Sequence, residues 1–217
     1  MTRRIHILGV AVVLLTTANA ASALYTPNPA GRWAPQHFYL AGDFQFTAEK
    51  DVEFSNGVDD TIDDILGVFV RPGYSIARNV VIYGRLGFQD ADHVDLGFAG
   101  GFGVQGAYVL PGAPEWAIGG AFDYVHWTAD IDNTDRDIDW NEFQLTPAVS
   151  YQVAQAPGLT PYAGLMLDFV DARNISESDP VGLLFGTNYD PNPHLRLDAQ
   201  FRVISETGFL FSVGYIF

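Results

Sequence analysis

A period of two in the apolar residues is the feature that most constrains what this chain can fold into. The last ten residues show it most clearly, because every second side chain is large and apolar: Phe209, Phe211, Val213, Tyr215 and Phe217. A β-strand sends successive side chains to opposite faces, so these five share one face. The same alternation recurs in about ten segments after residue 36, and turn residues separate them. The pattern predicts an all-β protein.

Composition indicates which solvent the apolar faces meet. Charged residues make up 17% of the chain, against roughly a quarter in soluble domains. A mean hydropathy of +0.08 is nevertheless far too low for a helical membrane protein, and 22 Gly and 12 Pro disfavour helices. Strands that face lipid on one side and a lumen on the other satisfy both limits. We predict a closed antiparallel transmembrane β-barrel of about ten strands over residues 36–217, with eight strands as the alternative.

The amino terminus has the pattern of a signal peptide. Arg3 and Arg4 precede an apolar run over residues 5–15, which is too short to span a membrane. Small residues then predict a signal peptide of residues 1–20, with cleavage as late as residue 23 as one alternative and an uncleaved anchor as another. The Pro-rich residues 21–35 are expected to form a periplasmic lead-in. Zero Cys excludes a lipoprotein, disulfides and thiolate metal sites.

Acidic residues gather at one rim of the predicted barrel. Threading ten strands up and down places residues 47–64, 89–95, 129–139, 171–180 and 204–207 at that rim. These segments hold 19 of the 26 acidic residues and only three basic ones, Lys50, Arg136 and Arg173. The chain thus predicts longer acidic extracellular loops and short, nearly neutral periplasmic turns.

These features resemble the small bacterial outer-membrane barrels of the OmpA-type and opacity-protein superfamily. The resemblance rests on the signal peptide, the hairpin periodicity, the Gly-rich residues 97–103 and the terminal Tyr215-Ile-Phe217. It implies a location in the cell outer membrane, in contact with lipid and lipopolysaccharide. It also implies that the alternating residues of the last strand, ending at Phe217, are the signal read by the outer-membrane assembly machinery.

The parity of a residue, that is, its odd or even position along a strand, decides which face it occupies, and it places a set of charged residues in the lumen. A ten-stranded barrel is only slightly wider than one whose interior side chains just fill it, so these charges must pair or stay hydrated. We expect an ion-pair network that braces the barrel, and the alternative is a narrow pore for small solutes. Small Ala99, Gly101 and Gly103 are expected to leave local room for water or a solute. The inward charged residues are Asp43, Arg71, Arg85, Asp123, Glu142, Asp168, Arg196, Asp198 and Arg202.

One acidic loop places carboxylates at nearly alternate positions: Asp130, Asp132, Asp135 and Asp137. Oxygen ligands of Ca²⁺ often follow such spacing, but the loop lacks the Gly and distal Glu of an EF-hand. A solvated loop is therefore favoured over a dedicated metal site. Contacts through divalent cations to lipopolysaccharide phosphates are expected instead.

Catalytic chemistry has little support in the sequence. His126 is close in sequence to Asp130 and Asp132, yet its parity points to lipid and no nucleophile stands out. We therefore expect no enzyme, with an outer-membrane hydrolase or acyltransferase as the alternative. No cofactor motif is present, and the acidic chain would repel nucleic acid. Trp127 and Trp140 are expected in an aromatic girdle at the membrane interface. The expected role is structural or surface interaction.

Overall fold

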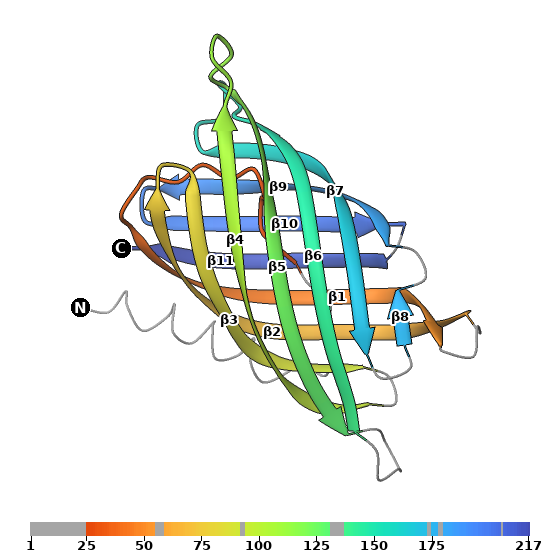
Figure 1. Cartoon of the computed structure of the whole chain (residues 1–217). Coiled ribbons are helices and arrows are strands. Elements are labelled where there is room, and N and C mark those ends of the chain that lie inside the picture. Colours follow the sequence, from red (N-terminus) through yellow and green to blue (C-terminus); the bar gives the residue numbers. More distant parts are fainter. Residues whose placement is uncertain are drawn as a thin grey trace.

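The computed structural model describes residues 25–54, 59–91, 94–130, 137–172, 175–177, 180–204 and 206–217. Strands make up most of this part of the chain (Figure 1), and none of its residues forms a helix long and apolar enough to cross a membrane. The strands are β1 (Phe38–Phe54), β2 (Asp59–Ala77), β3 (Val80–Ala91), β4 (Val94–Val109), β5 (Trp116–Asp130), β6 (Asp137–Tyr151), β7 (Leu159–Ala172), β8 (Ile175–Glu177), β9 (Val181–Asn192), β10 (Leu195–Val203) and β11 (Glu206–Ile216).

Ten of these strands form a closed antiparallel barrel. Neighbours in sequence pair with one another, β7 pairs with β9, and β11 pairs with β1 to close the ring. The closing register runs from Tyr39 opposite Ile216 to Lys50 opposite Glu206. Closure gives the backbone N–H and C=O groups of every barrel strand hydrogen-bond partners on both sides. A membrane-spanning sheet requires this because lipid offers no hydrogen bonds. The ten-stranded prediction is confirmed.

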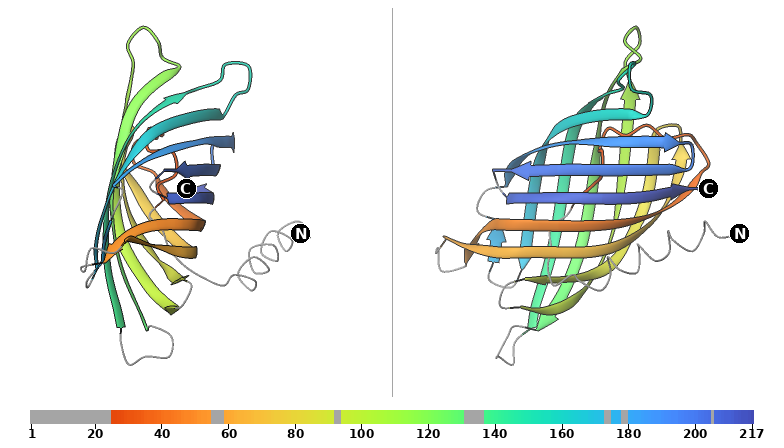
Figure 2. Two further views of the ribbon diagram at one scale, coloured as in Figure 1. Left: turned by 90° about the vertical axis from the view of Figure 1, so that its right-hand side faces the viewer. Right: turned by 180° about the vertical axis from the view of Figure 1, so that it is seen from behind.

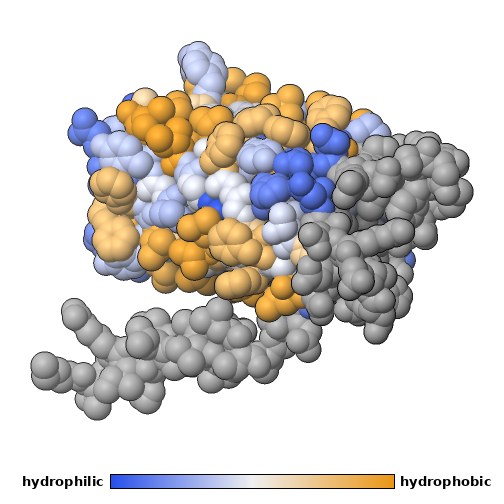
Figure 3. Space-filling model, turned by 60° about the horizontal axis from the view of Figure 1, so that its bottom comes forward, coloured by the Kyte–Doolittle hydropathy of each residue, from blue (hydrophilic) through white to orange (hydrophobic). Residues whose placement is uncertain are grey.

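The burial of side chains is the reverse of that in a soluble protein, because apolar residues face outward and polar residues face inward. On β4, Phe102 is 57% exposed, whereas Gln105 on the opposite face is 1% exposed. Across the molecule the large exposed residues are mostly apolar, while buried Asp, Glu, Arg and Gln side chains line the interior. Hydrophobic residues also cover large parts of the face shown in Figure 3. The burial of the described strands thus agrees with the predicted outward apolar and inward polar faces.

The two ends of the barrel differ. We call the end that carries Phe38, Phe217 and the short turns the turn end, and the opposite end the loop end (Figure 2). At the loop end, β1 runs to Phe54 and β2 starts at Asp59, so most of the predicted loop 47–64 is strand. The predicted loop 129–139 is likewise shorter. Polar residues occupy both parities in these segments, which removes the alternation without ending backbone pairing.

A β-bulge changes the parity of β1 near the loop end. The pairing with β11 passes from Thr47–Gly208 to Glu49–Thr207, so Ala48 has no opposite residue. A bulge of this kind shifts all later side chains by one face. Lys50, expected in an external loop, therefore lies inside the barrel with 1% exposure. Glu206, expected in the adjoining turn, is the first residue of β11 and is also buried.

The amino-terminal segment does not lie below the barrel. Its ribbon runs within the ring of strands (Figures 1 and 2), with Tyr25 fully buried and Trp33 8% exposed near the turn end. We call residues 25–33 the lumen segment. The expected periplasmic lead-in is therefore corrected for its described part. Pro-rich composition excludes a central strand correctly, but it does not distinguish a surface linker from a segment held by side chains.

Strand β8 lies across the loop end. It pairs with Val52–Phe54 of β1 and with Asp171 and Ala172 of β7. β1 and β7 are not neighbours in the barrel, so β8 bridges two separate parts of the wall (Figure 1).

A charge on the outer face should be poorly tolerated. Phe102 lies at the middle of β4 and points outward. We expect Phe102→Arg to lower the free energy of unfolding in lipid vesicles by about 2–4 kcal/mol, because the guanidinium would enter hydrocarbon. Phe102→Leu is the control and should lower it far less. Equal urea unfolding curves for the two variants would contradict the assigned lipid face.

Candidate functional site: the occupied lumen

The lumen segment is anchored by two aromatic residues. The hydroxyl of Tyr25 donates to the carbonyl oxygen of Phe46 at 3.2 Å, and the guanidinium of Arg202 lies over the Tyr25 ring at 3.8 Å. At the turn end, Arg196 lies 4.1 Å over the Trp33 ring. Cation–π contacts of this kind are stronger when desolvated, as these are.

Between these anchors the segment bonds to polar residues of the wall. The hydroxyl of Thr26 donates to Asp123, whose other oxygen accepts a bond from Tyr83 at 2.9 Å. The amide of Asn28 donates to Asn188 on β9. The segment thus contacts opposite sides of the barrel.

Several charged residues of the wall pair with one another. Arg71 binds both oxygens of Asp43, with Nε–Oδ2 at 2.7 Å and Nη2–Oδ1 at 3.1 Å. Ser212 donates to the same carboxylate at 2.6 Å. Arg85 pairs with Asp123 at 3.3 Å. Bidentate and hydrogen-bonded geometry of this kind is what compensates a buried charge for lost hydration.

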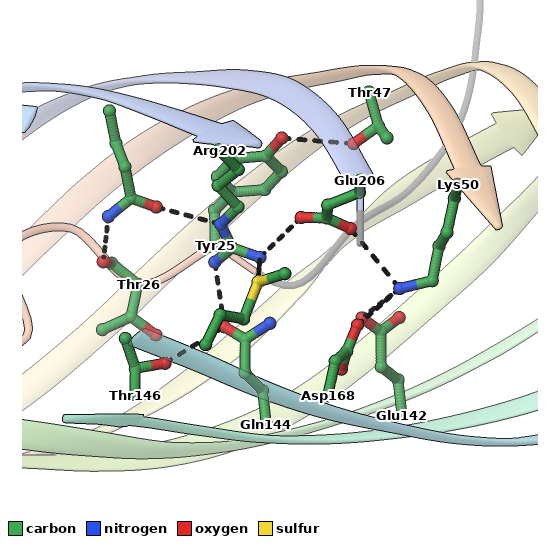
Figure 4. A network of polar contacts seen from close by, with 12 residues as sticks. Tyr25, Thr26, Thr47, Lys50, Glu142, Gln144, Thr146, Asp168, Arg202 and Glu206 are labelled. Atoms are coloured by element: carbon green, nitrogen blue, oxygen red, sulfur yellow. Dashed lines mark hydrogen bonds and ion pairs between the residues drawn. The ribbon is translucent and has the colours of Figure 1, made fainter. Parts of the chain in front are cut away.

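A cluster of charges around Lys50 occupies the loop-end half of the lumen (Figure 4). The Lys50 ammonium lies 3.2 Å from Glu142, 2.5 Å from Asp168 and 3.4 Å from Glu206. Arg202 extends the cluster toward Tyr25, with 2.8 Å bonds to Glu206 and to Gln144. These contacts join β1, β6, β7, β10 and β11.

The remaining predicted lumen residues lie nearer the turn end. Arg196 binds both oxygens of Asp190 at 2.7 Å, and Asp198 accepts a 2.6 Å bond from Tyr162. Sequence reasoning missed Lys50, Glu206 and Asp190 as lumen partners. The bulge conceals Lys50, whereas Asp190 lies where the predicted alternation of its strand is weak.

Small residues on β4 do not leave open space. A side chain at Gly101 would meet Val125, and one at Gly103 would meet the ring of Tyr83. The expected room for a solute is therefore already filled. Trp127 and Trp140, expected in an outer girdle, are both 3% exposed inside the barrel, with their rings 6.2 Å apart. Their parity matches that of Asp123 and Glu142, so the sequence contained the signal for this placement.

The predicted cation contacts lie mostly outside the described residues. Asp132 and Asp135 are not described, and only the backbones of Asp130 and Asp137 are, paired with each other at the end of the β5–β6 hairpin. Within the described residues, no group of three or more His or acidic side chains is arranged to hold a metal ion.

His126 lies at the loop end on the outward face. Its Nδ1 is 3.2 Å from Asn141 Oδ1 and 3.5 Å from Asp139. Tyr124 donates to the same Asn141 oxygen at 2.8 Å. This group is a hydrogen-bonded cluster on the outer surface of the barrel.

The carboxyl-terminal strand is fastened at the turn end. The amide of Phe217 donates to Phe38 at 2.9 Å, and His37 bonds to the Phe217 carbonyl oxygen at 2.9 Å. Tyr215 and Phe217 are 49% and 64% exposed. A cavity of about 280 Å³ lies near this end, between Arg32, Trp33, His37, Asp190 and Arg196.

Comparison with known proteins supports the fold. No protein-family model matches the sequence, and no curated protein matches it either. An outer-membrane channel from Pseudomonas putida F1 has a similar structure, with a TM-score of 0.53 and 11% identity over 89% of this chain and all of that one. The β domain of the Bordetella autotransporter BrkA follows at 0.47, with 14% identity over 84% of this chain and 99% of that one.

The fold therefore defines a class: a closed ten-stranded antiparallel barrel of the kind found in outer-membrane proteins. The lumen of this barrel holds the chain's own amino-terminal segment and a charged cluster around Lys50.

Removing the buried ammonium should destabilise the barrel. We expect Lys50→Met to lower the free energy of unfolding by about 3–5 kcal/mol, because three buried carboxylates lose their shared cation. Glu49→Gln, an exposed neighbour, is the control. Equal stability of the two variants in lipid vesicles would show that Lys50 does not hold the cluster.

Proposed function

We propose that this chain is an integral protein of the bacterial outer membrane with a closed lumen and a structural or surface-interaction role. The exposed apolar side chains on the outside of every barrel strand support membrane insertion. The likeness to the Pseudomonas putida outer-membrane channel supports the same location at the level of fold. The proposal assigns no catalytic activity and no cofactor.

The observation that carries the closed state is the occupied lumen. The lumen segment fills the turn-end half, while Lys50, Arg202 and their carboxylates fill much of the loop-end half. In a barrel this narrow, the two together block a continuous water path. We therefore assign the role of the resting protein to its outer surface and not to transport of solutes through the lumen.

The acidic loop end is the proposed working surface. Glu49, Asp64, Asp139 and Asp171 are exposed there, and the sequence adds four more acidic residues between β5 and β6, namely Asp130, Asp132, Asp135 and Asp137. Exposed charges are screened beyond about 8 Å at physiological ionic strength, so closer groups repel unless cations lie between them. We propose that divalent cations bridge these carboxylates to the phosphates of lipopolysaccharide.

The closed state predicts silence in planar bilayers. Purified protein inserted in a lipid bilayer should show no steady conductance, because the lumen segment and the Lys50 cluster obstruct the path. Insertion is checked separately by the altered gel position of unboiled protein. Steady large openings from inserted protein would contradict the closed resting state and favour a narrow pore.

The acidic rim predicts a cation effect that depends on the lipid. Mg²⁺ or Ca²⁺ should raise the unfolding temperature in vesicles that contain lipopolysaccharide, and much less in phosphatidylcholine vesicles. Replacing Asp130, Asp132, Asp135 and Asp137 by Asn should reduce the effect. If cations change neither protein in either lipid, the rim only contributes solubility.

A further inference from the structure

In addition to these side-chain contacts, the lumen wall holds the main-chain carbonyl groups of the lumen segment. Five wall side chains donate to carbonyl oxygens of the segment, at distances of 2.7–3.3 Å. The pairs are Arg85 to Tyr25, Gln200 to Thr26, Gln105 to Asn28, Ser150 to Ala30, and Arg196 to Arg32. The donors come from β3, β10, β4 and β6, so they surround the segment rather than line one side.

Carbonyl groups are common to all peptides, so this mode of contact does not depend on side chains. Peptide-binding proteins that pair with the main chain gain affinity from it and leave specificity to a few side-chain pockets. Here the pockets hold Tyr25 under Arg202 and Trp33 under Arg196. The wall therefore has the form of a peptide-binding site whose occupant belongs to the same chain.

The occupant can leave without separating ion pairs of the wall. Residues 25–31 carry no charged side chain. Asp123 keeps Tyr83 and Arg85 as partners when Thr26 is removed, and Arg202 keeps Glu206 and Gln144 when Tyr25 is removed. Breaking buried ion pairs is strongly unfavourable, whereas the hydrogen bonds of the segment, some of which involve charged groups of the wall, can be remade by another peptide.

The attachment of the segment also permits withdrawal. Within the described residues, its backbone bonds to backbone of the barrel only from Trp33 onward, where Asn79 donates to Trp33 at 3.0 Å and Gln36 donates to Ser75 at 2.8 Å. In the described structure, each hydrogen bond between Tyr25–Arg32 and the barrel therefore involves a side chain of at least one partner, and the backbone attachment lies at the turn end.

From these contacts we infer that the lumen is a binding site for short extended peptides that enter at the turn end, and that residues 25–33 are its resident competitor. A peptide would bind when the segment withdraws, with its carbonyl oxygens on Arg85, Gln105, Ser150 and Gln200. Binding itself needs only the folded barrel. The orientation toward the periplasm rests on the proposed outer-membrane function.

The test uses the full barrel with residues 25–33 replaced by a Gly-Ser sequence of equal length. The probe is a synthetic peptide of residues 25–33 with a fluorophore at its carboxyl end, and binding is measured by anisotropy in detergent micelles. The replaced barrel should bind at least tenfold more tightly than the unaltered protein, because the tethered segment no longer competes. Adding Gln105→Leu and Gln200→Leu should weaken binding at least tenfold.

Two further probes decide the class of ligand. A Pro-containing nonapeptide with unrelated side chains should bind within about tenfold of the native segment, while a linear oligosaccharide of similar length should not compete. Binding of the native segment alone would overturn the proposal, because the lumen would then be a dedicated socket. Equal competition by the oligosaccharide would also overturn it.

A second variant keeps the test decisive if the replaced barrel does not fold. An added methyl at Gly208 would overlap the Tyr25 hydroxyl, so Gly208→Ala should expel the tip of the segment. Gly42→Ala is the matched control, because Gly42 lies on the neighbouring strand β1 and an added methyl there would have no atom within 4 Å. Gly208→Ala should bind the unrelated nonapeptide more tightly than Gly42→Ala does, and equal binding would refute the proposal. A barrel that binds peptide in micelles but does not insert in vesicles would refute only the proposed function.

Discussion

Closure between β1 and β11 is the constraint on which the rest of the structure depends. An open edge would leave a row of N–H and C=O groups in lipid, where nothing can bond them. The seam joins them from Tyr39 to Lys50 and forces the alternate side chains of all ten strands either outward or into one shared interior. Because that interior is narrow and lined with charge, it must be filled by groups that satisfy one another. The ion pairs and the lumen segment both meet this requirement, because each fills part of the interior and supplies partners for its polar groups.

The two halves of the lumen meet that requirement with different groups. In the loop-end half, Lys50 neutralises carboxylates from three strands, and Arg202 connects Glu206 with the ring of Tyr25. The turn-end half contains wall pairs such as Arg71–Asp43 together with the lumen segment. Ion pairs thus brace both halves, and hydrogen bonds to a peptide are added in the turn-end half.

The strand faces could be predicted from sequence because lipid and lumen impose opposite preferences at every second residue. Prediction failed where that contrast is missing. Polar residues at both parities hide the ends of β1 and β2, and one extra residue, Ala48, turns Lys50 inward. Parity gives the inward set but not the pairs, since register depends on the turns and bulges. Asp190, the partner of Arg196, was missed because it lies where the apolar alternation of its strand is weak. Trp127 and Trp140 were recoverable, whereas nothing in the composition of residues 25–33 distinguishes a lumen occupant from a linker.

The carbonyl contacts of the lumen segment also order the events of folding. The donors lie on β3, β4, β6 and β10, so the complete site does not exist until these four strands surround the same space. The segment precedes all of them in the chain, yet it can form its final bonds only after they are in place. The described part of the amino terminus therefore cannot settle before the wall that surrounds it, and the barrel passes through a stage with an unfilled lumen.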